Sequence, residues 1–169
     1  MRKELENELC EIDPIFYEDL IACKNKKKDQ MDTCMYWGCE CGDGWFMPLA
    51  KLAEKTAFLN KVLTDYKTDA KLTALQIKEK FAELTIYEII RYPVTEGKEL
   101  KLTDEQNNVI DMVHKIYIDL YRKTAHDCYY KCEICGHDND KNNPIVTTKG
   151  WLSRICKECA EQNKKDYNL

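Results

Sequence analysis

The stretch that decides the fold is residues 132–159, CEICGHDNDKNNPIVTTKGWLSRICKEC, in which two Cys-x2-Cys pairs are separated by 20 residues. Each pair offers two thiolates to one ion, and two such pairs complete a tetrahedral ligand set. Gly136 follows the first pair, where a metal-binding knuckle needs a residue that tolerates a positive φ. We predict one structural zinc ion held by Cys132, Cys135, Cys156 and Cys159.

The residues between and after the pairs predict the rest of a small module. Residues 145–155, IVTTKGWLSRI, indicate a hairpin that turns near Lys149 and Gly150, and residues 158–167, ECAEQNKKDY, indicate a helix. A knuckle, a hairpin and a helix whose first turn supplies the last ligands form a treble-clef-like module. Because four thiolates leave no open position for water, we expect a structural ion. His137 is a competing ligand that the complete thiol set makes unnecessary.

The chain has ten cysteines among 169 residues and a formal net charge of −4. Disulfide bonds would need an oxidising compartment, and the charged segment MRKELENELCEID at residues 1–13 lacks the apolar core of a signal peptide. No apolar run approaches the ~20 residues of a membrane span. We therefore expect a cytoplasmic location, reduced cysteines and no coating of nucleic acid. Cys34, Cys39 and Cys41 fit either a second metal site or reduced core thiols.

Upstream of the module, hydrophobic periodicity predicts an α+β fold, and residues 103–106, TDEQ, form a capping box that predicts the start of a long helix. We expect helices over residues 1–12, 14–24, 45–67 and 103–125, a strand over 34–41, and a hairpin of strands 72–81 and 84–90. The fold class is thus helices on a small, mainly antiparallel sheet, with the zinc module at the C-terminal end. We predict a core domain over residues 1–127, with an N-terminal helical extension over 1–33, and a zinc-binding module over 128–169.

The turn Gly42-Asp43-Gly44 joins the predicted strand 34–41 to the predicted helix 45–67, and free amides at such a point favour an anion. Tryptophans flank the turn and could stack on a flat ring, and two lysines share one face of the following strand. The ordinary alternative is a capped helix start with core tryptophans and a solvated strand. The candidate ligand-binding residues are Trp37, Gly42, Asp43, Gly44, Trp45, Lys78, Lys80 and Trp151.

Three motifs in fixed order resemble a family of small, mostly uncharacterised phage and prophage proteins. They are ECGDGWF at residues 40–46, QIKEKF at 76–81 followed by Leu84 and Tyr87, and CEICG at 132–136 with GWLSRIC at 150–156. The family has Gly-Gly-Leu-Arg where this chain has AELT at residues 82–85, and the resemblance spans residues 34–160. It implies an accessory protein that acts in the host cytoplasm.

We therefore expect a non-catalytic binding protein, most concretely a counter-defence protein that sequesters a nucleotide immune signal. The alternative is a zinc-finger module that binds nucleic acid or occludes a host protein in transcription or defence, with nucleic acid the less favoured partner. An enzyme would need an acid–base pair such as Asp43 with Glu40, or Glu79 with a histidine, and no spacing in the chain nominates one. The oligomeric state stays open, because a binding pocket can be shared between two copies of the chain.

Overall fold

The computed structural model describes residues 1–23, 33–93, 101–149, 152–165 and 167–168. The chain contains both helices and two small sheets, which confirms the predicted α+β class. The elements are, in order, α1 (Lys3–Ile12), α2 (Glu18–Cys23), η2 (Cys34–Trp37), β1 (Cys39–Glu40), η3 (Asp43–Trp45), α3 (Phe46–Asp65), β2 (Lys71–Lys80), β3 (Glu83–Arg91), α4 (Asp104–Tyr129), β4 (Ile145–Thr148), β5 (Arg154–Cys156), α5 (Lys157–Gln162) and β6 (Tyr167–Asn168).

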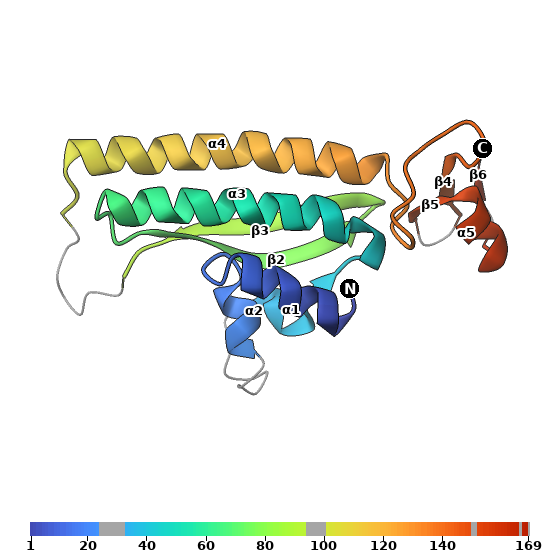
Figure 1. Cartoon of the computed structure of the whole chain (residues 1–169), viewed down its shortest axis with the longest axis horizontal. Helices are drawn as coiled ribbons and strands as arrows, with labels where there is room; N and C mark the ends of the chain where they lie inside the picture. Colours follow the sequence, from blue (N-terminus) through green and yellow to red (C-terminus); the bar gives the residue numbers. More distant parts are fainter. Residues whose placement is uncertain (24–32, 94–100, 150–151, 166, 169) are drawn as a thin grey trace.

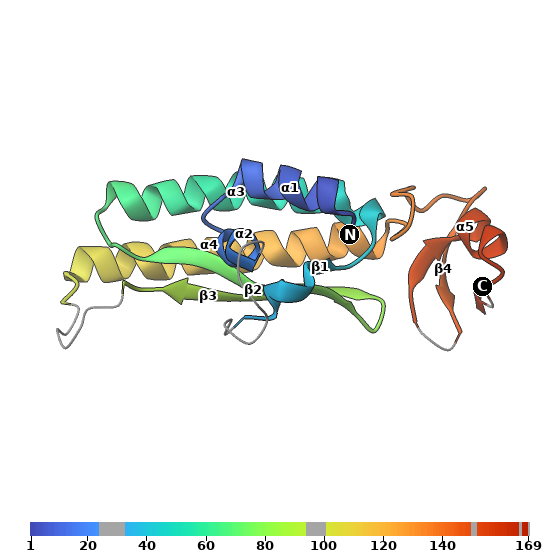
Figure 2. The same ribbon diagram turned by 90° about the horizontal axis from the view of Figure 1, so that it is seen from below.

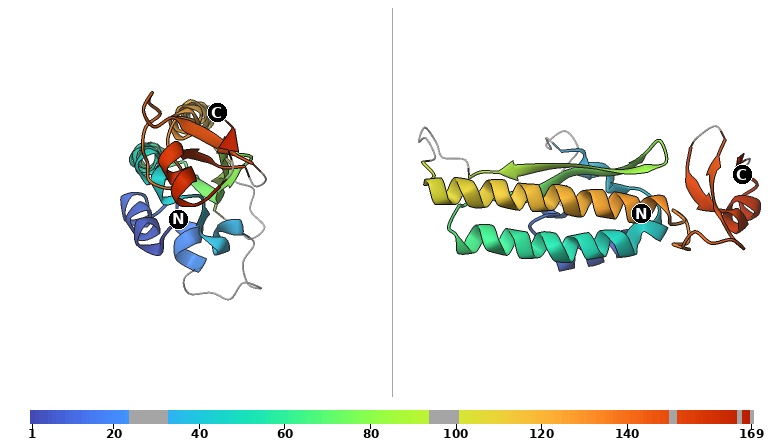
Figure 3. Two further views of the ribbon diagram at one scale, coloured as in Figure 1. Left: turned by 90° about the vertical axis from the view of Figure 1, so that its right-hand side faces the viewer. Right: turned by 90° about the horizontal axis from the view of Figure 1, so that it is seen from above.

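Two long helices and one long hairpin form the body of the molecule. Helices α3 and α4 lie side by side along the hairpin of β2 and β3, with α1 and α2 on the other side of α3 and the strands (Figures 1 and 3). Strand β2 pairs antiparallel with β3 and parallel with the short β1. The largest fully buried side chains of this body are Trp45, Tyr17, Tyr117, Phe16, Leu9, Met35, Leu49, Leu52, Leu63, Leu72 and Ile77.

Helix α4 begins with the capping box that the sequence predicts. The hydroxyl of Thr103 accepts a hydrogen bond from the Gln106 N–H, and the Gln106 side chain accepts one from the Thr103 N–H. Both otherwise unpaired donors of the first turn are thereby satisfied. The helix then runs to Tyr129, one turn beyond the predicted end, and carries the chain directly to the cysteine module.

The hairpin turns at Phe81 and Ala82, one residue earlier than the Ala82-Glu83 turn that the sequence suggests. Lys80 and Glu83 are still paired, so the connection has two residues. Phe81 has φ +54° and Ala82 has φ +67°. Positive φ at both positions is what a type I′ hairpin turn requires, and it is usually supplied by Asn and Gly. Phe81 and Ala82 therefore adopt a left-handed backbone conformation that is unfavourable for residues with these side chains.

The prediction of a strand over residues 34–41 is wrong. Residues Cys34–Trp37 form a 3-10 helix, and only Cys39–Glu40 are extended. Thr33 starts the helix because its hydroxyl accepts the Met35 N–H, and Gly38 ends it with φ +77°. The extended pair is held by the Glu6 carboxylate of α1, which accepts the Cys39 N–H at 2.6 Å.

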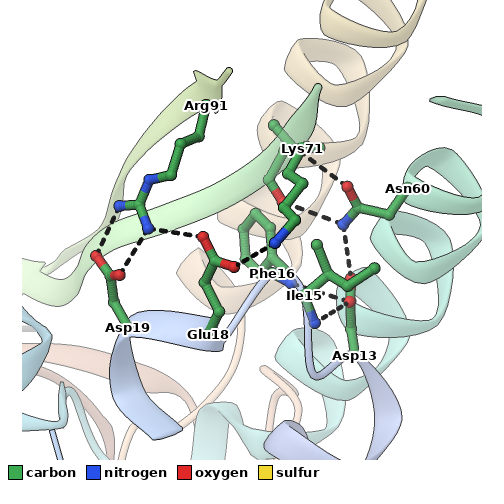
Figure 4. A network of polar contacts seen from close by, with 9 residues as sticks. Asp13, Ile15, Phe16, Glu18, Asp19, Asn60, Lys71 and Arg91 are labelled. Carbon is green, nitrogen blue, oxygen red and sulfur yellow. Dashed lines mark hydrogen bonds and ion pairs between the residues drawn. The ribbon is translucent and has the colours of Figure 1, made fainter. Parts of the chain in front are cut away.

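Ion pairs hold α2 against the base of the hairpin (Figure 4). The Arg91 guanidinium on β3 contacts both carboxylate oxygens of Asp19, at 2.8 and 3.0 Å, and Glu18 at 2.6 Å. Lys71 on β2 reaches the other oxygen of Glu18 at 3.1 Å. Helix α2 begins at Glu18, so the helix predicted from residue 14 forms only over its second half.

A buried amide joins α3 to the start of β2 (Figure 4). The Asn60 side chain accepts the Leu72 N–H at 2.9 Å and donates to the Leu72 carbonyl at 3.1 Å. It also approaches the Asp13 carboxylate at 3.5 Å, whose other oxygen accepts the N–H groups of Ile15 and Phe16. Burial raises the pKa of Asp13 despite these hydrogen bonds.

The C-terminal residues form a separate small sheet, with strand order β5-β4-β6, beyond the end of α4 (Figures 1 and 2). The predicted hairpin is present as β4 and β5, and its turn at residues 150–151 lies outside the described residues. The module has its own buried cluster around Val146, Ile155 and Ala160, distinct from the cluster of the body. Across the described ranges, no helix is both long and apolar enough to cross a membrane.

Candidate metal centre and adjoining cleft

The four cysteines predicted as ligands lie together. One sulfur from each of Cys132, Cys135, Cys156 and Cys159 lies within 4.8 Å of all the others, and three of the four residues are buried. The sulfurs of Cys135 and Cys156 are 3.7 Å apart, and all four cysteines are free thiols rather than disulfides. Four thiols converging on one point are the donor set of a structural metal site.

Local backbone geometry prepares the first pair to bind. Gly136 has φ +76°, and its N–H donates to the Cys132 carbonyl at 2.8 Å. The Cys135 N–H points at the Cys132 sulfur at 3.5 Å, where it stabilises negative charge on a thiolate. The tight knuckle predicted from Gly136 is therefore present.

The second pair is positioned by the end of the hairpin and the start of α5. Cys156 is the last residue of β5, and α5 begins at Lys157, so Cys159 lies in the first turn of the helix. The carbonyl of Pro144 accepts the Lys157 N–H, which ties this turn to the strand beside it. His137 lies outside the cluster and pairs instead with Asp140 at 2.9 Å.

The turn Gly42-Asp43-Gly44 lies directly against the knuckle. The Gly44 N–H donates to the Glu133 carbonyl at 2.8 Å, and the Gly42 N–H donates to the Glu133 carboxylate at 3.0 Å. A Cβ atom on Gly42 would lie 2.1 Å from the Glu133 carbonyl oxygen, and one on Gly44 would lie 2.0 Å from the Cys132 carbonyl oxygen. Both glycines are needed because backbone meets backbone at this junction.

Trp45 also contributes to the contact between this turn and the knuckle. Its side chain is fully buried, and its ring N–H donates to the Lys131 carbonyl at 3.3 Å. The Gly42 and Gly44 amides are likewise engaged by Glu133, which removes the basis for an anion site at this turn. Asp43 pairs with the Arg2 side chain at 2.5 Å and accepts its backbone N–H.

The structure does not gather the remaining candidate ligand residues at one place. Trp37 is 59% exposed and lines a shallow hollow between α1 and η2. Lys78 and Lys80 line a different cleft near the hairpin turn. Trp151 lies outside the described residues. The pocket predicted from tryptophans, amides and lysines is therefore not assembled as the sequence suggests.

The cleft beside the hairpin turn has a volume of about 800 Å³. The turn points toward the metal module (Figure 2), and the cleft lies where the two face each other. Its lining includes Lys78, Lys80 and Phe81 from the hairpin, and Glu133, Leu152 and Ser153 from the module. The metal module thus supplies one wall of the cleft.

Sequence reasoning missed Phe81 and Glu133. Phe81 is 75% exposed at the turn, and the only sequence signal for it is the missing glycine of the two-residue connection. Burial, followed by the nearby Glu79 carboxylate, raises the pKa of Glu133. Nothing in the sequence marks Glu133, because the residue that it binds through its side chain, Gly42, is 91 positions away.

The other cysteines do not form a second site within the described ranges, where the four clustered thiols are the single group of potential ligands found. Cys39, Cys41 and Cys128 are buried, and burial raises the pKa of each thiol, for Cys41 to about 12. They are therefore neutral near pH 7, which fits the reading of reduced core thiols.

Comparison of the chain with protein-family models, with curated proteins and with solved structures finds no match.

Proposed function

We propose that the four-cysteine cluster holds one zinc ion in a structural role. An all-thiolate tetrahedral set selects zinc over the harder divalent cations, and it leaves no position for substrate or water. When bound, the ion cross-links the knuckle to α5. The module has only a small buried cluster of its own, and a domain of this size gains most of its folding free energy from the metal.

We infer that the metal serves to present a binding surface rather than a reaction centre. The single observation that carries this inference is the cleft between the hairpin turn and the metal module. Its one cysteine, Cys41, has a pKa raised by burial to about 12, so its thiol is a poor nucleophile near neutral pH. Binding without turnover is what such a lining supports.

The function that we propose is that of a phage accessory protein that sequesters a nucleotide immune signal in the host cytoplasm. The resemblance of the three motifs to phage proteins supports a role in an infected host cell. Lys78, Lys80 and the exposed Phe81 ring in the cleft support a nucleotide as the ligand. A protein that captures a signal needs only affinity and abundance, so no acid–base pair is required.

A host protein is the second candidate partner, because two apolar side chains of the module are exposed. Ile134 is 41% exposed and Leu152 is 40% exposed. Nucleic acid is favoured less, because the Arg154 guanidinium is already engaged within the protein. It stacks on the Tyr129 ring, 3.6 Å from the ring centroid, and donates to the Tyr129 backbone carbonyl. Capture of one host protein, lost on Ile134→Asp, would favour this candidate.

Native mass spectrometry of the protein purified from its host, with elemental analysis, tests the proposal. We expect one zinc ion per chain and a retained nucleotide that is chemically unchanged. Calorimetric titration with cyclic nucleotides and with ADP-ribose then gives the affinity. Folded protein without zinc would refute the structural ion, and turnover of any bound compound, or no binding to any nucleotide of the panel, would refute sequestration.

A further inference from the structure

We propose that the cleft between the hairpin turn and the metal module is a site for a nucleoside diphosphate, with Phe81 stacking on the base and Lys78 and Lys80 holding the phosphates. This proposal rests on the proposed function and names its site and ligand class. The cleft volume of about 800 Å³ lies within the ~300–1,000 Å³ of typical small-molecule sites.

Among the described residues, the two lysines of the cleft form no ion pair. Lys78 and Lys80 are two residues apart on β2, so both side chains leave the same face of the strand. Within the described residues, the ammonium groups contact only aromatic rings, Tyr87 at 5.1 Å and Phe81 at 5.7 Å. Two neighbouring ammonium groups without an ion pair fit the two phosphates of a diphosphate.

The carboxylates of the cleft are, in contrast, already engaged. Glu40 accepts the Gln76 side-chain N–H at 3.0 Å, Glu79 accepts the Ala82 N–H, and Glu133 accepts the Gly42 N–H at 3.0 Å. Each carboxylate retains lone pairs that can accept the exocyclic amine of a base. Because the cleft is lined by both lysines and glutamates, it disfavours a ligand that carries only negative charge. It favours a ligand that has phosphates at one end and N–H donors at the other.

The aromatic side chain is presented at a conformational cost. Phe81 is 75% exposed, and its φ of +54° places a bulky residue in the left-handed region. The ring buries little surface, and its one described contact is the nearby Lys80 ammonium, so it contributes little to folding. Backbone strain of this kind gathers at functional sites, and a ring beside paired lysines is a stacking surface for a base.

The test uses the full-length, metal-loaded protein and ADP-ribose as the probe, in calorimetric titration. We expect ADP-ribose to bind, and adenosine and inorganic pyrophosphate to bind about tenfold or more weakly, because each offers only half of the contacts. Phe81→Ala should weaken ADP-ribose binding about tenfold, and Phe81→Tyr should retain it. The double charge reversal Lys78→Glu with Lys80→Glu should weaken it at least as much.

Matched controls separate the site from general effects on the protein. Phe58→Ala removes a similarly exposed ring from α3, and Lys115→Glu reverses a charge on α4; both should leave binding unchanged. If ADP-ribose binds but the cleft variants bind as well as the wild type, the site assignment is overturned while sequestration stands. If ADP-ribose does not bind but another nucleotide of the panel does, the ligand class is overturned; if none binds, sequestration fails with it.

Discussion

Replacing Gly44 with alanine tests the junction on which the arrangement of body and module depends. Gly44 has no positive φ, so alanine is compatible with its backbone, and the change acts through contact alone. The added Cβ would lie 2.0 Å from the Cys132 carbonyl oxygen, 2.4 Å from the Gly136 nitrogen and 2.8 Å from the Glu133 carbonyl oxygen. All three are backbone atoms of the knuckle, so no flexible side chain can move aside, and the knuckle must separate from the turn.

The expected cost follows from the bonds that this separation breaks. They are the Gly44 N–H to the Glu133 carbonyl, the Gly42 N–H to the Glu133 carboxylate, and the Trp45 ring N–H to the Lys131 carbonyl. At ~1 kcal/mol for each neutral bond and ~2 kcal/mol for the charged one, the loss is about 4 kcal/mol. For a protein of this size, that loss lowers the melting temperature by about 8–16 °C.

Differential scanning calorimetry of the zinc-loaded proteins measures the effect, with Met47→Ala on the exposed face of α3 as the control. The zinc content of the Gly44→Ala variant should remain one ion per chain, because all four cysteines are intact. If the turn were free of the knuckle, alanine would instead stabilise the protein slightly through its higher helix propensity. A melting temperature equal to or above that of the wild type would therefore refute the docking of the knuckle on this turn.

Three further predictions concern the body of the protein. Asn60→Ala leaves the buried N–H and C=O of Leu72 without partners, and urea unfolding should show a loss of about 3 kcal/mol; a loss under about 1 kcal/mol would contradict the bridging role. Because burial raises the pKa of Asp13 above its ordinary 3.8, the folded state binds more protons than the unfolded state between the two pKa values. The free energy of unfolding of the wild type should thus fall as pH rises from about 4 through the folded pKa. Compared with Asp13→Asn, which does not titrate in this range, the wild type should lose stability as pH rises; a relative gain over the same range would contradict the raised pKa. Native protein treated with iodoacetamide at pH 8 should be alkylated at the exposed Cys34 but not at Cys41, whose pKa is about 12, and peptide mass mapping that finds Cys41 modified first would show that the thiol is not buried.

The sequence predicted best those features that depend on neighbours along the chain. The two Cys-x2-Cys pairs predict the cluster of Cys132, Cys135, Cys156 and Cys159 because binding one metal ion restricts the spacing of its ligands. Thr103 and Gln106 mark a helix start because the residues of a capping box are only three positions apart. The strand predicted over residues 34–41 is wrong because a short apolar and aromatic run suits a strand and a 3-10 helix equally. Their conformation is decided by Thr33 and by the Glu6 carboxylate of α1, which is 33 positions from the backbone N–H that it accepts.

The glycine turn shows the same dependence on distant residues. Free amides at a helix start suit an anion, so the sequence leaves a ligand site and a plain helix start as alternatives at Gly42 and Gly44. In the folded chain the Glu133 carboxylate accepts the Gly42 N–H, and the neutral Glu133 carbonyl accepts the Gly44 N–H. Only the folded chain shows that the two motifs, which are far apart in the sequence, satisfy each other.

This pairing gives the metal site an influence beyond its own module. Glu133 lies between the ligands Cys132 and Cys135, so an ion that fixes those sulfurs also fixes the residue that docks on the body. Coupling between two equilibria is reciprocal, and docking must therefore raise the affinity for the ion by the same factor by which the ion favours docking. If the cluster holds an ion as we propose, that ion favours the docked position of the cleft wall that carries Glu133, Leu152 and Ser153. The four cysteines would then influence ligand binding in the cleft through Glu133, without contacting the ligand themselves.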